Sequence, residues 1–162
     1  MSINVGDRLP QATFRVMTPD GPKPKTTDEI FGGKRMVLFA VPGAFTPTCS
    51  RNHLPGFIKN AAAIKAKGID QIAVTSVNDA FVMDAWKNAS GAEGAVDLFL
   101  ADGNADFARA VGLDHDSTDA GRGIRSKRYS MIIEDGVVKS INIEEAAGKA
   151  EISGAENLLR QL

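Results

Sequence analysis

Short, continuously apolar segments alternate along the chain with segments of helical periodicity. The clearest apolar run is Met-Val-Leu-Phe-Ala-Val over residues 36–41, which ends at Pro42 and predicts a strand buried on both faces. Comparable runs predict four further strands, over residues 72–77, 96–100, 128–133 and 137–143. The last two flank Glu134-Asp135-Gly136, and an Asp-Gly pair in this setting is a strong signal for a β-hairpin.

Helical spacing of apolar residues predicts the elements between these strands. Helices are expected over residues 52–67, 106–111 and 153–162, and from a cap at Asn78 or Asp79 through Trp86. Ser153 at the start of the last helix, with Glu156 three residues later, matches a capping box. Residues 18–29 are rich in Gly, Pro and charge and predict a surface loop. The alternation predicts an α/β fold with a mixed sheet and helices on both faces, in one domain over residues 1–162.

The composition excludes several classes of protein. Of the 162 residues, 43% are hydrophobic and 24% are charged, which is ordinary for a globular domain with its own core. The 19 basic and 20 acidic side chains give a net charge of −1 and a pI near 6.1, so no basic field favours nucleic acid. The first residues lack the basic start and apolar stretch of a signal peptide, and no apolar run is long enough to span a bilayer. We therefore expect neither a nucleic acid nor a membrane as partner.

The chain has a single cysteine, Cys49. One cysteine forms no disulfide within the chain and builds no Cys-rich zinc site, so no metal or other cofactor is expected. Such a composition fits a reducing compartment, and we expect a cytoplasmic protein. Any functional role of Cys49 depends on its chemistry as a thiol.

This cysteine follows the clearest strand and precedes the clearest helix. Pro42 ends the strand, Thr46 can cap the helix, and Pro47 suits the first helical position, which places Cys49 in the first turn. The unpaired N–H groups and the partial positive charge of a first turn favour the thiolate over the thiol. Two interpretations of Cys49 stay open at this point, a reactive thiolate and a small buried apolar residue.

The segment Pro-Gly-Ala-Phe-Thr-Pro-Thr-Cys-Ser over residues 42–50, with the spacing P-x-x-x-T-x-x-C, resembles the active-site motif of peroxiredoxins. Together with the following His53-Leu-Pro-Gly-Phe57, it is similar to the type 5 (type II) subfamily in particular. Two further blocks, over residues 76–83 and 128–138, also resemble that subfamily, and the likeness extends from Gly6-Asp-Arg-Leu-Pro10 to the last helix. The resemblance implies a thioredoxin-like fold with the peroxiredoxin N-terminal extension.

The resemblance also implies an activity and roles for four residues. Cys49 would reduce hydrogen peroxide and small alkyl hydroperoxides, and would become a sulfenic acid. Thr46 would hydrogen-bond to the peroxide, Arg128 would stabilise the thiolate and orient the peroxide, and Pro42 would shield the sulfur from water. Taken singly, each of these three residues has a simpler explanation: Thr46 as a helix cap, Arg128 as a surface charge and Pro42 as the end of a strand.

Many relatives carry a second cysteine that resolves the sulfenic acid, whereas here Val74 stands at one position that is often cysteine. We therefore expect a one-cysteine cycle in which an external thiol, glutathione with glutaredoxin or thioredoxin, reduces Cys49. The resemblance further implies a homodimer that pairs near the active-site loop. Phe45, Phe81 and Trp86 are candidates for that interface, although the spacing of Phe81 and Trp86 favours the interior.

Two other classes of protein compete with this interpretation. A cysteine hydrolase would use Cys49 with His53 or His115, and would need an orienting group and an oxyanion hole that neither neighbourhood supplies. A thioredoxin-fold binding protein or chaperone would carry a structural cysteine, which leaves the agreement of Thr46, Cys49 and Arg128 unexplained. His53, one turn after Cys49, is either a thiolate partner or a partly buried helix residue.

Overall fold

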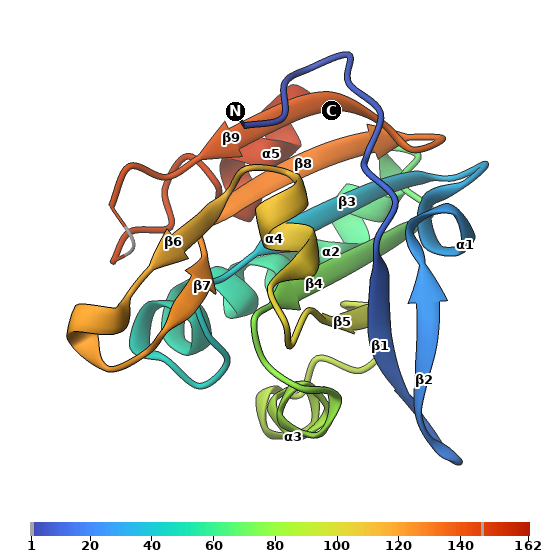
Figure 1. Cartoon of the computed structure of the whole chain (residues 1–162). Coiled ribbons are helices and arrows are strands. Elements are labelled where there is room, and N and C mark those ends of the chain that lie inside the picture. The colour runs from blue at the N-terminus through green and yellow to red at the C-terminus, as the bar shows by residue number, and fades with distance from the viewer. Residues whose placement is uncertain (1, 147) are drawn as a thin grey trace.

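The computed structural model describes residues 2–146 and 148–162 and is built around a mixed seven-stranded sheet (Figure 1). The strands lie in the order β2-β1-β5-β4-β3-β8-β9. Strands β3, β4 and β5 are parallel, and the other pairings of this sheet are antiparallel, which confirms the predicted mixed sheet. The bounds are β1 Thr13–Thr18, β2 Gly21–Thr26, β3 Arg35–Ala40, β4 Gln71–Ser76, β5 Leu98–Ala101, β8 Tyr129–Glu134 and β9 Val137–Ile143. A separate two-stranded hairpin joins β6 Asp114–Asp116 to β7 Ile124–Ser126.

Helices cover both faces of the sheet, as the alternation of elements predicted. The helices of the described chain are α1 Thr27–Phe31, η1 Cys49–His53, α2 Leu54–Ala66, α3 Ala80–Ser90, α4 Asp106–Ala110 and α5 Ala155–Gln161, with the short η2 Thr118–Ala120 between β6 and β7. Along β3, Val37 and Phe39 share a core with α2, α3 and α5, whereas Met36 and Leu38 share a core with α1 and α4. Figure 1 shows α4 in front of the sheet and α2 and α5 behind it. In the described part of the chain, no helix reaches the length and apolarity that a membrane span requires.

Strands β8 and β9 form the predicted hairpin. Glu134 pairs with Val137, so Asp135 and Gly136 are the two loop residues, with φ of 46° and 76°. A two-residue turn of type I′ needs left-handed backbone at both positions, which Asp and Gly tolerate. Because Tyr129 pairs with Ala40, the hairpin also places the preceding residue at the end of the sheet where β3 ends.

The prediction of a loop over residues 18–29 was wrong, because this segment contains β2 and the start of α1. Strand β2 lies at the edge of the sheet and pairs with β1 over six residues of each strand. Its prolines, Pro22 and Pro24, occupy alternate positions, and an edge strand tolerates missing N–H groups that would point away from its neighbour. Strands β1, β6 and β7 were also not predicted, since none of them is a continuous apolar run.

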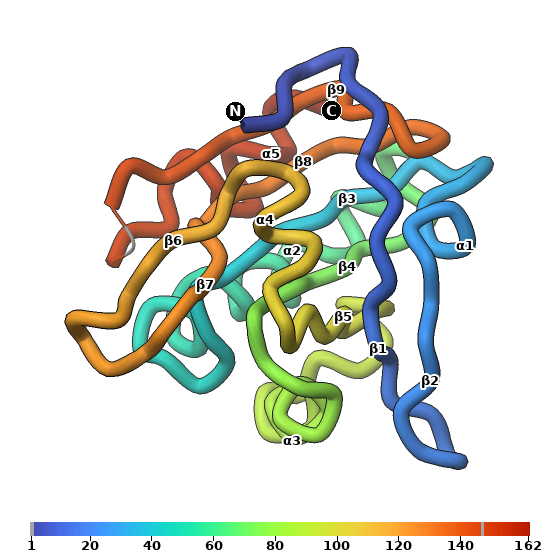
Figure 2. The backbone as a smooth tube through the Cα atoms, viewed as in Figure 1, coloured from blue at the N-terminus to red at the C-terminus, as the bar shows by residue number. Residues whose placement is uncertain are grey.

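At the opposite edge of the sheet, the N-terminal segment pairs with the start of β9. The Gly6 N–H donates to the Val138 carbonyl, and the Leu9 N–H donates to the Gly136 carbonyl, each at 2.8 Å. Arg8 and Val137 form an isolated antiparallel bridge between these two bonds. The tube in Figure 2 follows this segment across the sheet and then into β1.

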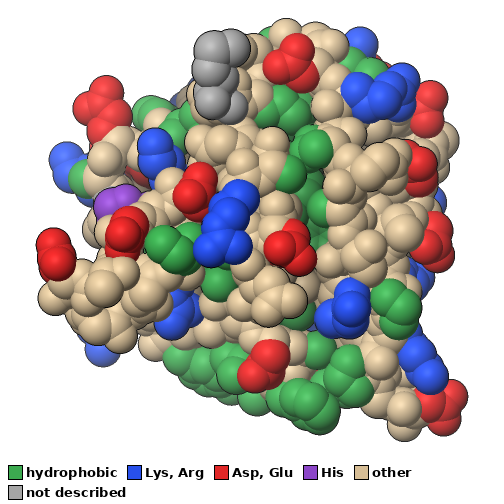
Figure 3. Space-filling model, viewed as in Figure 1, with side chains coloured by type: hydrophobic (Ala, Val, Ile, Leu, Met, Phe, Trp, Pro, Cys, Tyr) green, Lys and Arg blue, Asp and Glu red, His purple; other side chains and the backbone are tan. Residues whose placement is uncertain are grey.

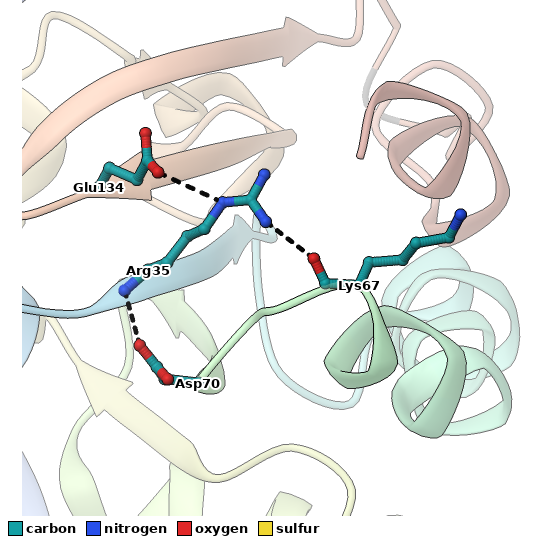
Figure 4. A network of polar contacts seen from close by, with 4 residues as sticks. All are labelled: Arg35, Lys67, Asp70 and Glu134. Carbon is teal, nitrogen blue, oxygen red and sulfur yellow. Dashed lines mark hydrogen bonds and ion pairs between the residues drawn. The ribbon is translucent and has the colours of Figure 1, made fainter.

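Arg35 is the centre of a network of polar contacts at the end of the sheet where β3 begins (Figure 4). The backbone N–H of Arg35 donates to the Asp70 carboxylate at 2.8 Å, and its guanidinium donates to the Lys67 carbonyl at 2.9 Å. The same guanidinium lies 3.6 Å from the Glu134 carboxylate. The side chain of Arg35 is 34% exposed and that of Glu134 is 49% exposed. This network joins the C-terminal end of α2 to β3 and β8.

Candidate active site

The loop between β3 and the following helix is anchored to the chain that leaves β4. The Ala44 N–H donates to the side-chain oxygen of Asn78 at 3.0 Å, and the Ser76 hydroxyl donates to the same oxygen at 2.7 Å. Between these anchors and the helix, Phe45 has a φ of 63°, a left-handed conformation that costs a residue with a side chain about 1–2 kcal/mol. Strained residues of this kind cluster at functional sites.

Cys49 lies in the first turn of the helix that follows, as predicted. Helical backbone begins at Pro47, and the Ser50 N–H donates to the Thr46 carbonyl at 2.9 Å. From Cys49 the backbone widens into the π-helical turn η1, in which the Leu54 N–H donates to the Cys49 carbonyl. Single π turns are frequent at functional sites. The Cys49 side chain is completely buried in this setting.

Arg128, which directly precedes β8, reaches Cys49 across the end of the sheet. Its Nη2 donates to Cys49 Sγ at 3.0 Å, and its Nη1 donates to His53 Nδ1 at 2.9 Å. Arg128 is only 2% exposed, so both contacts are shielded from water. A guanidinium at this distance places a positive charge and an N–H donor directly against the buried sulfur.

His53 is buried and neutral. Burial, and secondly the nearby Arg128 charge, lower the pKa of His53 from 6.5 to about 3. Its partners also fix the tautomer: a guanidinium can only donate, so Nδ1 accepts and Nε2 carries the hydrogen, which it donates to the Ser153 carbonyl at 3.0 Å. The imidazole therefore links Arg128 to the segment that precedes α5.

That segment is held in turn by a buried carboxylate. The Glu144 Oε1 accepts the Ser153 N–H at 2.9 Å and the Ser153 hydroxyl at 3.1 Å. The predicted helix cap at Ser153 is wrong: α5 begins at Ala155 with Gly154 as its N-cap residue, and Ser153 donates both its N–H and its hydroxyl to Glu144. The backbone N–H of Glu144 donates to the Arg128 carbonyl at 2.9 Å.

The other two predicted site residues lie in the same region. The Thr46 hydroxyl donates to the Gly43 carbonyl at 2.7 Å, so its oxygen can still accept a hydrogen bond from a peroxide. Pro42 and Arg128 line a cleft of about 650 Å³, together with residues of the β6–β7 hairpin and the chain after β9. In Figure 2 that hairpin projects from the sheet on the side of η1. Within the described ranges, no three His, Cys, Asp or Glu side chains are placed to hold a metal ion.

Comparison with known proteins decides the family. The sequence model of the Redoxin family matches residues 4–159. The chain is 52% identical to Peroxiredoxin-2E-2, chloroplastic, of Oryza sativa subsp. japonica over 165 residues, covering 99% of this chain and 73% of that protein. The chain belongs to the peroxiredoxins. Within them it is a type II member, and its enzyme class is thiol peroxidase.

Two crystal structures resemble this peroxiredoxin along almost all of its length. Reduced Prx3 of Vibrio vulnificus in complex with H2O2 has a TM-score of 0.92 and 52% identity, covering 98% of each chain. Peroxiredoxin 5 of Alvinella pompejana has a TM-score of 0.84 and 32% identity, covering 98% of this chain and 96% of the other. The expected thioredoxin-like fold is thereby confirmed.

For this peroxiredoxin, the structure brings Cys49 and Arg128 into direct contact, and Pro42 and Arg128 line the same cleft. Thr46 lies on the same loop, and its described hydrogen bonds go to backbone groups of that segment. Sequence reasoning left His53 undecided between a thiolate partner and a helix residue, and its contact is with Arg128. The hydrolase interpretation lacks a base, because both ring nitrogens of His53 are engaged and His115 is exposed on β6.

Sequence reasoning missed Glu144 and assigned Ser153 to a helix cap, whereas both residues belong to the surroundings of Arg128. No local signal points to Glu144, because its role depends on contacts with chain segments that lie far along the sequence. The sequence pattern was right that Ser153 makes structural hydrogen bonds, because the residue is fully buried. Its hydrogen-bond partner is the Glu144 carboxylate and not the start of the helix. A further contact was also missed: Trp86 Nε1 donates to the hydroxyl of Ser50, the neighbour of Cys49, at 3.0 Å.

Proposed function

We propose that Cys49 is the peroxidatic residue and that it reduces hydrogen peroxide and small alkyl hydroperoxides. The thiolate attacks the terminal peroxide oxygen, the S–O bond forms as the O–O bond breaks, and the alkoxide or hydroxide leaves with the electron pair. The leaving oxygen takes up a proton to give alcohol or water, and Cys49 is left as a sulfenic acid. The observation that carries this proposal is the 3.0 Å contact between the guanidinium of Arg128 and a fully buried sulfur.

Formation of the thiolate alone does not explain a fast reaction. An ordinary thiol is already about 3% ionised at pH 7, so complete ionisation raises the rate by at most about thirtyfold. The remaining acceleration requires donors aimed at the charge that develops on the leaving oxygen. In the proposed arrangement Arg128 supplies this charge stabilisation, Thr46 accepts a hydrogen bond from the peroxide, and Pro42 limits the access of water.

The second half of the cycle depends on another molecule, because the chain has one cysteine. An external thiol attacks the sulfenic acid sulfur, water leaves, and a mixed disulfide forms. A second thiol then releases Cys49 as a thiolate and becomes part of the departing disulfide. We propose glutathione with glutaredoxin, or thioredoxin, as the physiological reductant.

The test of the peroxidase mechanism uses Trp86, the single tryptophan, whose indole is bonded to the residue after Cys49. Stopped-flow fluorescence after mixing the reduced protein with peroxide should give a second-order rate far above that of free cysteine, with Cys49 identified as the oxidised residue by mass spectrometry. The matched control is Cys49→Ser, which should give no fluorescence change. A rate equal to that of a small thiol would overturn the assignment of Cys49.

The reductant is identified by turnover. With excess peroxide, consumption should stop after one equivalent and continue only when a thiol system is added. Separate reactions with glutathione alone, glutathione with glutaredoxin, and thioredoxin with its reductase distinguish the candidates. Continued consumption without any added thiol would contradict the one-cysteine cycle.

We also propose a homodimer that pairs near the active-site loop. Phe45 is 53% exposed and Phe81, in α3, is 66% exposed, and large exposed apolar side chains are typical of interface cores. Figure 3 shows hydrophobic side chains gathered over α3 along one edge of the molecule. The expectation that Phe81 is interior was wrong, whereas Trp86 is fully buried. Sedimentation equilibrium should give twice the chain mass, and Phe45→Ser with Phe81→Ser should give the mass of one chain.

The cytoplasmic location and the single domain stay predictions. The location rests on the presence of one cysteine, and cell fractionation tests it against an organellar location. The domain prediction is supported by the family match over residues 4–159, and limited proteolysis that leaves one resistant fragment would agree with it.

A further inference from the structure

We infer that His53 is a positioning residue of the peroxidase reaction: it holds the guanidinium of Arg128 against Cys49, and the chain before α5 holds His53 in turn. This inference rests on the proposed role of Cys49. It concerns how the arginine keeps its orientation in a buried site, since a guanidinium at the end of a long flexible side chain has many rotamers and only a few direct an N–H at the sulfur.

The guanidinium of Arg128 contacts both Cys49 and His53. Its Nη2 lies 3.0 Å from Cys49 Sγ and its Nη1 lies 2.9 Å from His53 Nδ1. Because the guanidinium is planar and its donors have fixed directions, an acceptor at Nη1 restricts where Nη2 can point. His53 thus fixes the donor that faces the sulfur without touching the sulfur through any described hydrogen bond.

The acceptor of the Arg128 guanidinium, His53, carries no charge. The ring of His53 is neutral, because burial and the Arg128 charge keep its pKa near 3. A carboxylate in its place would attract the guanidinium more strongly, but would also compensate the positive charge that the thiolate and the leaving oxygen require. The neutral ring of His53 orients the guanidinium through this bond and brings no negative charge of its own against it.

The chain before α5 supports the imidazole of His53. His53 Nε2 donates to the Ser153 carbonyl at 3.0 Å across one hundred residues of sequence, and Glu144 accepts both donors of Ser153. Glu144 also contacts Arg128 through the backbone, since the Glu144 N–H donates to the Arg128 carbonyl at 2.9 Å. These bonds form a closed ring that includes both the side chain and the backbone of Arg128. The orientation of Arg128 therefore depends on the chain after β9 as well as on the loop that carries Cys49.

Three substitutions of His53 separate positioning from packing. His53→Asn keeps an acceptor near the place of Nδ1, His53→Gln keeps a polar group near the place of Nε2, and His53→Leu removes both. We expect His53→Leu and His53→Gln to slow the reaction of Cys49 with peroxide by about 10- to 100-fold, the range of a misplaced catalytic group. His53→Asn should recover most of this loss. Equal losses in all three variants, or a wild-type rate in His53→Leu, would overturn the inference.

Two further measurements complete the test. Ile64→Val alters a fully buried residue of α2 and serves as the matched packing control, with an expected peroxide rate equal to that of the wild type. Nitrogen-15 NMR spectra should show that His53 is protonated at Nε2 and unprotonated at Nδ1 from pH 5 to pH 8. A doubly protonated ring in this range would contradict the hydrogen bond from Arg128 to Nδ1. If the wild type itself reacts no faster than free cysteine, the proposed function fails; a fast wild type with an equally fast His53→Leu refutes only the positioning role.

Discussion

Two arginines lie at opposite ends of the same pair of strands and serve different purposes. Arg35 begins β3 and pairs with Glu134 at the end of β8, whereas Arg128 precedes Tyr129, which pairs with the last residue of β3. Each arginine joins β3 or β8 to a helix, Arg35 at the end of α2 and Arg128 at the turn that leads into α2. The chemistry of the two contacts differs because their surroundings differ.

The network of Arg35 is open to water. Its side chain is 34% exposed, its carboxylate partner is 49% exposed, and exposed pairs of this kind contribute between 0 and about 1 kcal/mol. Arg128 is 2% exposed and contacts a thiol and a neutral imidazole. Arg35, in contact with water, connects elements of the fold, whereas Arg128 lies buried beside a sulfur, where its charge can act on a reaction.

Arg128→Ala should slow the reaction with peroxide more than any other substitution considered below. Removal of one donor that stabilises developing charge costs about 10²- to 10³-fold in rate, and we expect a loss of this size in the second-order reaction with peroxide. Stopped-flow fluorescence measures it, with Arg128→Lys as the variant that keeps the charge but loses the fork of donors. An unchanged rate in Arg128→Ala would remove the distinction between the two arginines.

The second effect is a pH dependence of stability at the Arg128 end. In the folded chain the pKa of His53 is about 3, against 6.5 for an ordinary histidine. Between these values the unfolded chain binds the additional proton, so the free energy of unfolding falls as the pH falls, by up to about 1.4 kcal/mol per pH unit. Urea unfolding at several pH values between 7 and 4 should show this slope, and His53→Asn should lack it. Identical slopes would mean that the folded chain protonates His53 normally.

A smaller effect is expected for Thr46. Thr46→Val keeps the shape of the side chain and removes the hydroxyl, and we expect about a tenfold slower reaction with peroxide, equal to about 1.4 kcal/mol. Thr46→Ser keeps the hydroxyl and is the matched variant. If Thr46→Val reacts as fast as Thr46→Ser, the hydroxyl serves only its bond to the Gly43 carbonyl.

The smallest effect belongs to the exposed network. Glu134→Gln should change the free energy of unfolding by less than about 1 kcal/mol and leave the peroxide rate unaltered. A double-mutant cycle with Arg35→Met isolates the pair, and addition of salt should weaken the coupling. A loss of peroxidase activity in Glu134→Gln would show that the two ends of the strand pair are not independent.

The sequence was most informative where the structure depends on neighbouring residues. The proline after Thr46 and the pair Asp135-Gly136 specify a helix start and a hairpin through local backbone preferences, and both predictions are confirmed. The contact of Arg128 with Cys49 spans 79 residues of sequence, so only the family resemblance pointed to it. Local patterns failed at Ser153, whose donors bond to a carboxylate that no sequence rule places nearby.

The two edges of the main sheet determine how copies of this chain can meet. At one edge, Pro22 and Pro24 lack the N–H groups that a further strand would need. At the other edge, residues 6–9 already pair with residues 136–138 at the start of β9. An uncovered edge strand recruits other chains into growing sheets and is a common origin of aggregation. Because these features restrict strand addition at both edges, we expect the folded protein to resist amyloid-like stacking, and we expect specific pairing of copies through the side chains of helices and loops.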